Sequence, residues 1–263
     1  RGLTAPATNP HTTQGATDLP VAVADTGTMT EDDAPTSFNV IANDSQDPDS
    51  TASNVITLGP AGITVTGPAG ETFVNTDATA SIVANQVQVT LNNAHFQQLA
   101  LGEHATVTVP YTLTGDAGET STANLVVTVN GVNDVPVAVD DSGTMTEDQS
   151  GHAFTVLTND TLDADHGAPN NVTAGAVTNL VAPSGENIDL TDVAVSVNGS
   201  NQVVVNLGSD FQHLKDGESA TFDVAYTLHG DQAGDTSTAE LHVTVTGAND
   251  APVAVPDDNG GNI

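Results

Sequence analysis

Apolar and polar residues alternate along four segments of this chain. Between 104 and 114 the apolar positions are Ala105, Val107, Val109, Tyr111 and Leu113, and between 219 and 229 they are Ala220, Phe222, Val224, Tyr226 and Leu228. The segments that follow have the same spacing, with Ala123, Leu125, Val127 and Val129, and with Ala239, Leu241, Val243 and Val245. A period of two residues puts every second side chain on one face of a β-strand. The pattern therefore predicts strands with one buried face.

Turn-forming residues separate these strands from shorter apolar segments. Aromatic residues make up only 3% of the chain and Trp is absent, while Val, Thr and Ala are abundant, which favours strands over helices. We expect each half to form two packed antiparallel sheets of roughly seven strands, an immunoglobulin-like β-sandwich. Pro110 predicts an edge or a bulge, because proline cannot donate a ladder hydrogen bond. Helix is expected only as a turn at Phe96–Leu99.

A long internal repeat divides the chain. The motif DLPVAV at position 18 returns as DVPVAV at 134 and as DAPVAV at 250, so neighbouring copies start 116 residues apart. A fixed period of this kind indicates tandem copies of one structural unit. We therefore predict a flexible lead-in over 1–17, one sandwich over 18–133, a second over 134–249, and the start of a further repeat over 250–263.

Acidic residues outnumber basic ones by 34 to 2, which gives a formal net charge of −32. Binding of nucleic acid or of an anionic membrane needs clustered Lys and Arg, so both partners are excluded. No apolar segment approaches the roughly 20 residues of a membrane helix. Cysteine is absent, so no disulfide stabilises the chain.

The acids are concentrated in short loops. Asp outnumbers Glu by 26 to 8, and the loops NDSQDPDS and NDTLDADH occupy equivalent places in the two halves. Salt adaptation or solubility would spread acids over the whole surface, and single Asp residues are common in loops because they form Asx-turns. Recurrence at equivalent places, with almost no counter-charge, favours a shared local role for these side chains.

In the usual order of strands in a sandwich, these loops and the loop after the sixth strand lie at one end of a unit, and the repeated Glu-Asp pair lies at the other. The end of the first unit, the linker and the start of the second unit would then meet. Ca²⁺ takes six to eight oxygen ligands in irregular geometry, whereas Mg²⁺ demands a tighter octahedron. The sequence therefore predicts calcium. The candidate ligands at the junction are Glu31, Asp32, Asn133, Asp134, Asp160, Asp163, Asp165 and Asp231, and equivalent positions elsewhere add Asp44, Asp47, Asp49, Asp116, Glu147, Asp148 and Asp250.

Three stretches, VNDVPVAVDDSGTMTED, VLTNDTLDAD and YTLHGDQAGDTSTAELHVTVTGANDAPVAV, resemble the VCBS and cadherin-like tandem repeats of large bacterial RTX-type surface adhesins. The resemblance covers both units. It implies immunoglobulin-like sandwiches in a rod with calcium at the joints, which holds an adhesive region away from the cell. It also implies a secreted, cell-surface location, neighbouring repeats of the same chain as partners, and a monomeric fragment. The glycine-rich nonapeptide calcium repeat of RTX proteins is absent from this sequence.

Motifs for catalysis are lacking. The eight His residues show no zinc-hydrolase spacing, and there is no nucleophile elbow or phosphate-binding loop. A carboxylate pair could hydrolyse glycosides, but few aromatics are present to stack on sugars. We therefore expect a calcium-stiffened spacer without enzymatic activity. The alternative is a calcium-dependent module that binds a glycan or a protein, and the region between Asn54 and Asn85, where the two units differ most, is where such a site would lie.

Overall fold

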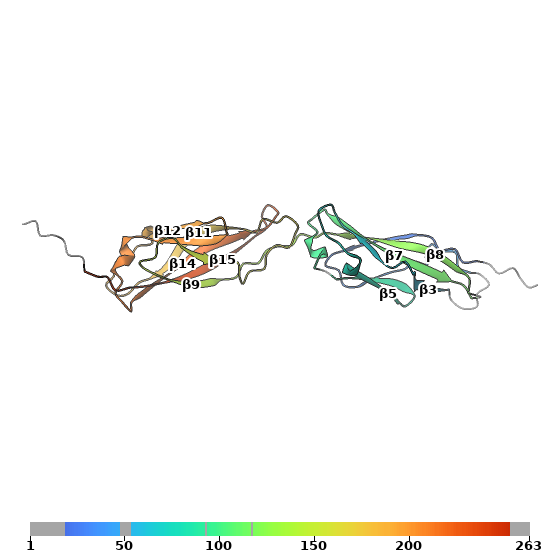
Figure 1. Cartoon of the computed structure of the whole chain (residues 1–263), viewed down its shortest axis with the longest axis horizontal. Coiled ribbons are helices and arrows are strands. Elements are labelled where there is room, and N and C mark those ends of the chain that lie inside the picture. Colours follow the sequence, from blue (N-terminus) through green and yellow to red (C-terminus); the bar gives the residue numbers. More distant parts are fainter. Residues whose placement is uncertain (1–18, 48–53, 93, 117, 253–263) are drawn as a thin grey trace, which may run out of the picture. The chain divides into compact units, whose positions relative to one another are not determined.

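The computed structural model describes residues 19–47, 54–92, 94–116 and 118–252, and it divides into two compact units, Arg1–Val132 and Asn133–Ile263. In the described ranges both units are built from strands, with helix only as short 3-10 turns (Figure 1). The expected all-β sandwich class is confirmed. Among the described residues, no helix has the length and apolar character needed to span a membrane. The predicted lead-in over 1–17 and most of the segment 250–263 lie outside the described residues.

Unit 1 packs a larger sheet against a smaller one. The larger sheet has the order β1-β8-β7-β3, with β4 also paired to β7, and the smaller has the order β2-β6-β5. The strands are β1 (Asp25–Thr30), β2 (Thr36–Phe38), β3 (Val55–Leu58), β4 (Thr64–Thr66), β5 (Ala78–Val83), β6 (Gln86–Leu91), β7 (His104–Thr114) and β8 (Thr120–Asn130). The 3-10 turns are η1 (Asn75–Asp77) and η2 (Phe96–Gln98), and the second lies where the helical turn was predicted.

Unit 2 repeats this arrangement. Its sheets have the orders β11-β14-β15-β9 and β10-β13-β12. The strands are β9 (Asp141–Thr146), β10 (His152–Thr155), β11 (Asn171–Val181), β12 (Val193–Val197), β13 (Gln202–Leu207), β14 (Ser219–His229) and β15 (Thr236–Thr246), and the 3-10 turns are η3 (Leu190–Asp192) and η4 (Ser209–His213). A single long strand, β11, therefore takes the place that β3 and β4 share in unit 1.

One feature of the sheets differs from the prediction of purely antiparallel pairing. The first strand of each unit pairs in parallel with the last: β1 with β8 from Asp25↔Leu125 to Thr30↔Asn130, and β9 with β15 from Asp141↔Leu241 to Thr146↔Thr246. Parallel neighbours need a long connection instead of a hairpin, and the rest of the unit supplies it. Period-two patterning reports which face of a strand is buried and does not report the direction of its neighbour.

Pro110 lies in β7, between β8 and the strands on its other side. On that other side the ladder is interrupted: Leu58 of β3 pairs with Tyr111, and Thr64 of β4 pairs with Thr108. A chain without an N–H at this position tolerates such a gap. Unit 2 has Ala225 at the equivalent place in β14, and the β11–β14 register also shifts between Ala174 and Val177. The irregularity predicted from Pro110 is therefore present on one side of the strand.

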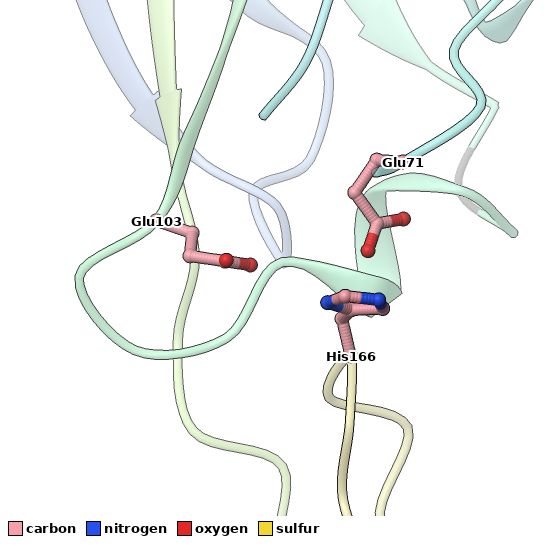
Figure 2. A group of neighbouring side chains, drawn as sticks. All are labelled: Glu71, Glu103 and His166. Carbon is pink, nitrogen blue, oxygen red and sulfur yellow. The ribbon is translucent and has the colours of Figure 1, made fainter. Parts of the chain in front are cut away.

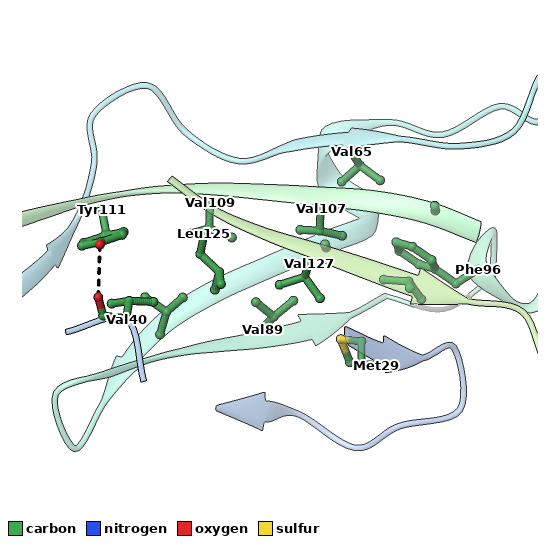
Figure 3. Close-up of a cluster of buried hydrophobic side chains, with 14 of the residues drawn as sticks. Met29, Val40, Val65, Val89, Phe96, Val107, Val109, Tyr111, Leu125 and Val127 are labelled. Carbon is green, nitrogen blue, oxygen red and sulfur yellow. Dashed lines mark hydrogen bonds between the residues drawn. The ribbon is translucent and has the colours of Figure 1, made fainter. Parts of the chain in front are cut away.

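The core of each unit lies between its two sheets. Figure 3 shows Val107 of β7 and Val127 of β8 facing Val89 of β6, and all three side chains are fully buried. Every apolar residue that the alternation placed on the inner face of β7 and β14 is buried. Burial of one such side chain contributes about 1.5–3 kcal/mol. The packed strands fix the ends of each sandwich, where the acidic loops lie.

Candidate metal centre

Six oxygen-bearing residues of unit 2 gather at the end where the linker joins the sandwich, and we call this group the Asp163 site. Its members are Asn133, Asp134, Asp163, Asp165, Asp231 and Asp235. The linker supplies the first two, the loop after β10 the next pair, and the loop between β14 and β15 the last pair. One carboxylate oxygen from each of Asp163, Asp231 and Asp235 lies within 4.8 Å of the others.

The Asp163 carboxylate joins the two loops. Its Oδ1 accepts a hydrogen bond from the Asp165 N–H at 2.9 Å, and its Oδ2 accepts one from the Asp231 N–H at 2.9 Å. The linker is held in turn, because the Asp134 N–H donates to Asp165 Oδ2 at 3.2 Å. Gly230 leaves space for the cluster, since a β-carbon there would collide with the carboxylates of Asp163 and Asp235.

Four oxygens of the site are buried without a hydrogen-bond donor in the described part of the chain. They are Asn133 Oδ1, Asp165 Oδ1, Asp231 Oδ1 and Asp235 Oδ2. The side chains of Asp163, Asp165 and Asp235 are only 4%, 3% and 6% exposed. Burial of an unpaired carboxylate oxygen is costly, so the arrangement is compatible with a cation among these oxygens.

Electrostatics supports this description. Burial, followed by the charges of Asp163, Asp231 and Asp134, raises the pKa of Asp165 to about 6, although the hydrogen bond from the Asp134 N–H lowers it. Burial and then the contact with Asp163 also raise the pKa of Asp235. A divalent cation would reverse both effects, because it stabilises the ionised carboxylates.

Unit 1 has a related group at the equivalent end. Carboxylate oxygens of Asp47, Asp116 and Glu119 lie within 4.8 Å of one another, and Asp47 is 3% exposed. The Asp116 backbone nitrogen lies 3.4 Å from Asp47 Oδ2. The equivalent distance in unit 2, from the Asp231 nitrogen to Asp163 Oδ2, is 2.9 Å. Asp49, the other predicted ligand of this loop, lies outside the described residues.

The repeated Glu-Asp pairs lie at the opposite end of each unit, and their two members differ. Glu31 is 3% exposed and accepts a hydrogen bond from the Val132 N–H at 2.7 Å, while Glu147 is 2% exposed and accepts one from the Ala248 N–H at 2.6 Å. Each glutamate therefore fixes the chain as it leaves the last strand. By contrast, Asp32, Asp148 and Asp250 are exposed.

Two further acids of unit 1 also lie near its end. Figure 2 shows Glu71 and Glu103. One carboxylate oxygen of Glu71 lies within 4.8 Å of one carboxylate oxygen of Glu103. The Glu103 carboxylate accepts from the Ala100 N–H, and its carbonyl accepts from the Gly131 N–H just before Val132. The sequence prediction did not select either residue, although both recur in unit 2, as Glu186 and Glu218.

Asp44 and Asp160 are placed differently from the other predicted ligands. Asp160 Oδ1 accepts from the Val139 N–H at 2.8 Å and lies 3.3 Å from the Tyr226 hydroxyl. Asp44 repeats this in unit 1, with the Val23 N–H and the Tyr111 hydroxyl. The structure therefore places donors of the same unit beside these two carboxylates, and neither belongs to a metal-ligand group formed by the described residues.

Asp235 and Glu119 are members of these groups that the sequence prediction omitted. Each follows a glycine turn a few residues after a predicted ligand, in GDQAGD and GDAGE. The recurrence of an acid at the end of both loops was the signal that could have identified them. The side chains of the Asp163 site offer carboxylate and amide oxygens, which is the donor set that Ca²⁺ prefers.

No family model and no curated protein matches the chain. Among solved structures it is similar to human CDH23 EC21-23, with 19% identity over 88% of this chain and 70% of that chain and a TM-score of 0.42. Drosophila N-cadherin EC1-4 gives 14% identity over 89% of this chain and 50% of that chain, with a TM-score of 0.42. Mouse Protocadherin-24 EC1-3 gives 18% identity over 88% and 70%, with a TM-score of 0.38.

Proposed function

We propose that the two units are calcium-binding spacer repeats of a large secreted bacterial surface adhesin and have no catalytic activity. The observation that carries this proposal is the Asp163 site, with its four buried oxygens that lack a donor within the described residues. The bacterial and adhesin parts of the proposal rest on the repeat motifs of the sequence.

A cation at the Asp163 site would act on the linker. Asn133 and Asp134 belong to this site, and the residue before them, Val132, donates its N–H to Glu31 of unit 1. Calcium at the site would hold Asn133 and Asp134 against unit 2. The linker would then lose conformational freedom directly after Val132, which Glu31 already holds in unit 1. Without calcium, the carboxylates repel one another and the linker is released.

The chemistry suits an extracellular location. Extracellular calcium modules bind with a Kd of about 0.1–1 mM, so a site of this class fills outside cells and stays empty at cytosolic calcium. The chain would be flexible during export and would stiffen afterwards.

The test combines calorimetry with solution scattering on the full chain. Calcium titration should show heat from sites that D163N/D165N weakens, and small-angle X-ray scattering should show a narrower range of interdomain shapes with millimolar calcium than with a chelator. The control is D216N, which removes one acid from an exposed turn. Scattering that does not respond to calcium would reject the stiffening mechanism, and unchanged calorimetry in the double variant would reject the ligand assignment.

A further inference from the structure

The outer face of the larger sheet of unit 2 carries a second group of possible metal ligands, which includes a histidine nitrogen and so differs from the Asp163 site. One ligand atom from each of Asp223, Glu240 and His242 lies within 4.8 Å of the others. Asp223 is on β14, and Glu240 and His242 are on β15. We propose that these three residues form a binding site for a first-row divalent transition metal such as Zn²⁺, separate from the calcium sites.

The ladder between β14 and β15 builds this group. Asp223 stands directly opposite His242, and Glu240 precedes His242 by two residues, which puts all three on the same face. This face points away from the core, since Phe222, Val224, Leu241 and Val243 are the buried neighbours. Position on two central strands makes the group more rigid than one on loops.

The atomic spacing suits a small metal ion. His242 Nδ1 lies 2.6 Å from Asp223 Oδ1. Zinc binds imidazole nitrogen and carboxylate oxygen at about 2.0–2.2 Å each, which places two ligand atoms of a tetrahedral ion about 3.4 Å apart. The exposed His242–Asp223 pair would therefore open by about 0.8 Å to admit the ion. Imidazole with carboxylates is a donor set for transition metals, whereas calcium prefers oxygen alone.

Further groups orient the ligands and add charge. The Asn179 side-chain amide donates to Asp223 Oδ2 at 2.7 Å, and this leaves Oδ1 directed at His242. Asp140 accepts from the Glu240 N–H at 2.9 Å and adds a further carboxylate charge near His242. Hydrogen bonds that hold a ligating carboxylate in place are typical outer partners of metal sites.

Unit 1 provides a natural comparison. The β7–β8 ladder has Thr108 opposite Val126, where unit 2 has Asp223 opposite His242. It has Pro110 opposite Asn124, where unit 2 has Ala225 opposite Glu240. None of these unit 1 residues has a titratable side chain. The group thus belongs to one of two closely similar repeats, so it is not required by the sandwich itself.

The experiment is a zinc titration of the full chain by calorimetry in millimolar calcium, with Co²⁺ absorption as a second readout. We expect one zinc site whose affinity falls about tenfold or more in H242Q and in D223N, because each loses a direct ligand. The control is H95Q, since His95 forms a similar pair with Asp77 at 2.8 Å, for which the described residues offer no third ligand.

His242 is half-exposed, so its replacement should leave the melting temperature nearly unchanged. Equal zinc affinity in wild type and H242Q would overturn the proposal. So would an equal loss in H95Q, which would indicate scattered histidine binding. Both results are independent of calcium binding, so failure of the zinc site would leave the spacer proposal standing.

Discussion

Replacing Asp165 with Asn tests the charge that the Asp163 site carries when it holds no cation. The Asn side chain keeps one oxygen, which can still accept from the Asp134 N–H as Asp165 Oδ2 does. Its neutral amide nitrogen takes the place of the buried, unpaired Oδ1. In a chelator at neutral pH, D165N should therefore be more stable than the wild type. A substitution of a predicted ligand would then raise the free energy of unfolding in the absence of calcium.

The magnitude follows from linkage. Folding moves the pKa of Asp165 from 3.8 to about 6, so the ionised carboxyl opposes folding by at most about 3 kcal/mol at pH 7, at 1.36 kcal/mol for each pKa unit. The sign is that of an acid with a raised folded pKa: its unfavourable contribution is absent below pH 3.8 and grows as pH rises towards 6. At pH 5 the same relation gives about 1.6 kcal/mol.

Denaturant unfolding at several pH values, with a chelator and with 10 mM calcium, measures both states. Calcium should add about 1.4–2.7 kcal/mol to the wild type if Kd lies between 0.1 and 1 mM, and should add much less to D165N. D216N provides the control for loss of one exposed charge. If D165N is less stable than the wild type in chelator at pH 7, the carboxyl is not destabilised by its surroundings and the electrostatic argument is refuted.

Two matched pairs of substitutions test the packing and hydrogen bonding around the acids. G230A should weaken calcium binding in calorimetry, because its β-carbon displaces the carboxylates at the centre of the Asp163 site. The control G199A should leave calcium binding unchanged, since a β-carbon there meets nothing within 4 Å. Equal calcium affinity in the two variants would contradict the steric argument. Y111F should lower the free energy of unfolding by about 1–3 kcal/mol in denaturant titrations. The substitution removes the one hydroxyl hydrogen that a carbonyl and two carboxylates inside unit 1 have within hydrogen-bond distance. Y226F should match it in unit 2 if the two clusters are equivalent.

The sandwich was predictable because its determinants are local and repeated. Alternation in the segments that became β7 and β14 identified the inner faces residue by residue, down to Tyr111 and Tyr226. The period of 116 residues then allowed one half to support the other. The parallel pairing of β1 with β8 was not predictable in this way, since it joins strands about 100 residues apart through backbone groups that every sequence shares.

The candidate metal centre was predictable only in part. Asp163, Asp165 and Asp231 lie close together, as expected from their loops in a β-sandwich. The linker residues Asn133 and Asp134 join them. Asp160 belongs to the same sequence motif, yet its side chain turns to the Tyr226 hydroxyl. Which of several neighbouring acids faces a cluster depends on side-chain direction and on donors from distant strands, and spacing alone does not contain that information.

The parallel pairing at the edge of each sandwich has a mechanical consequence for a chain under tension. Force enters unit 1 before β1 and leaves it after β8, and these neighbouring strands run in the same direction over six paired positions. Pulling the two ends apart therefore slides one strand along the other, so the hydrogen bonds across the pair resist together in shear. A hairpin pulled from its open end would instead lose its bonds one after another. The strands that close each sandwich thus act as a clamp between its two ends.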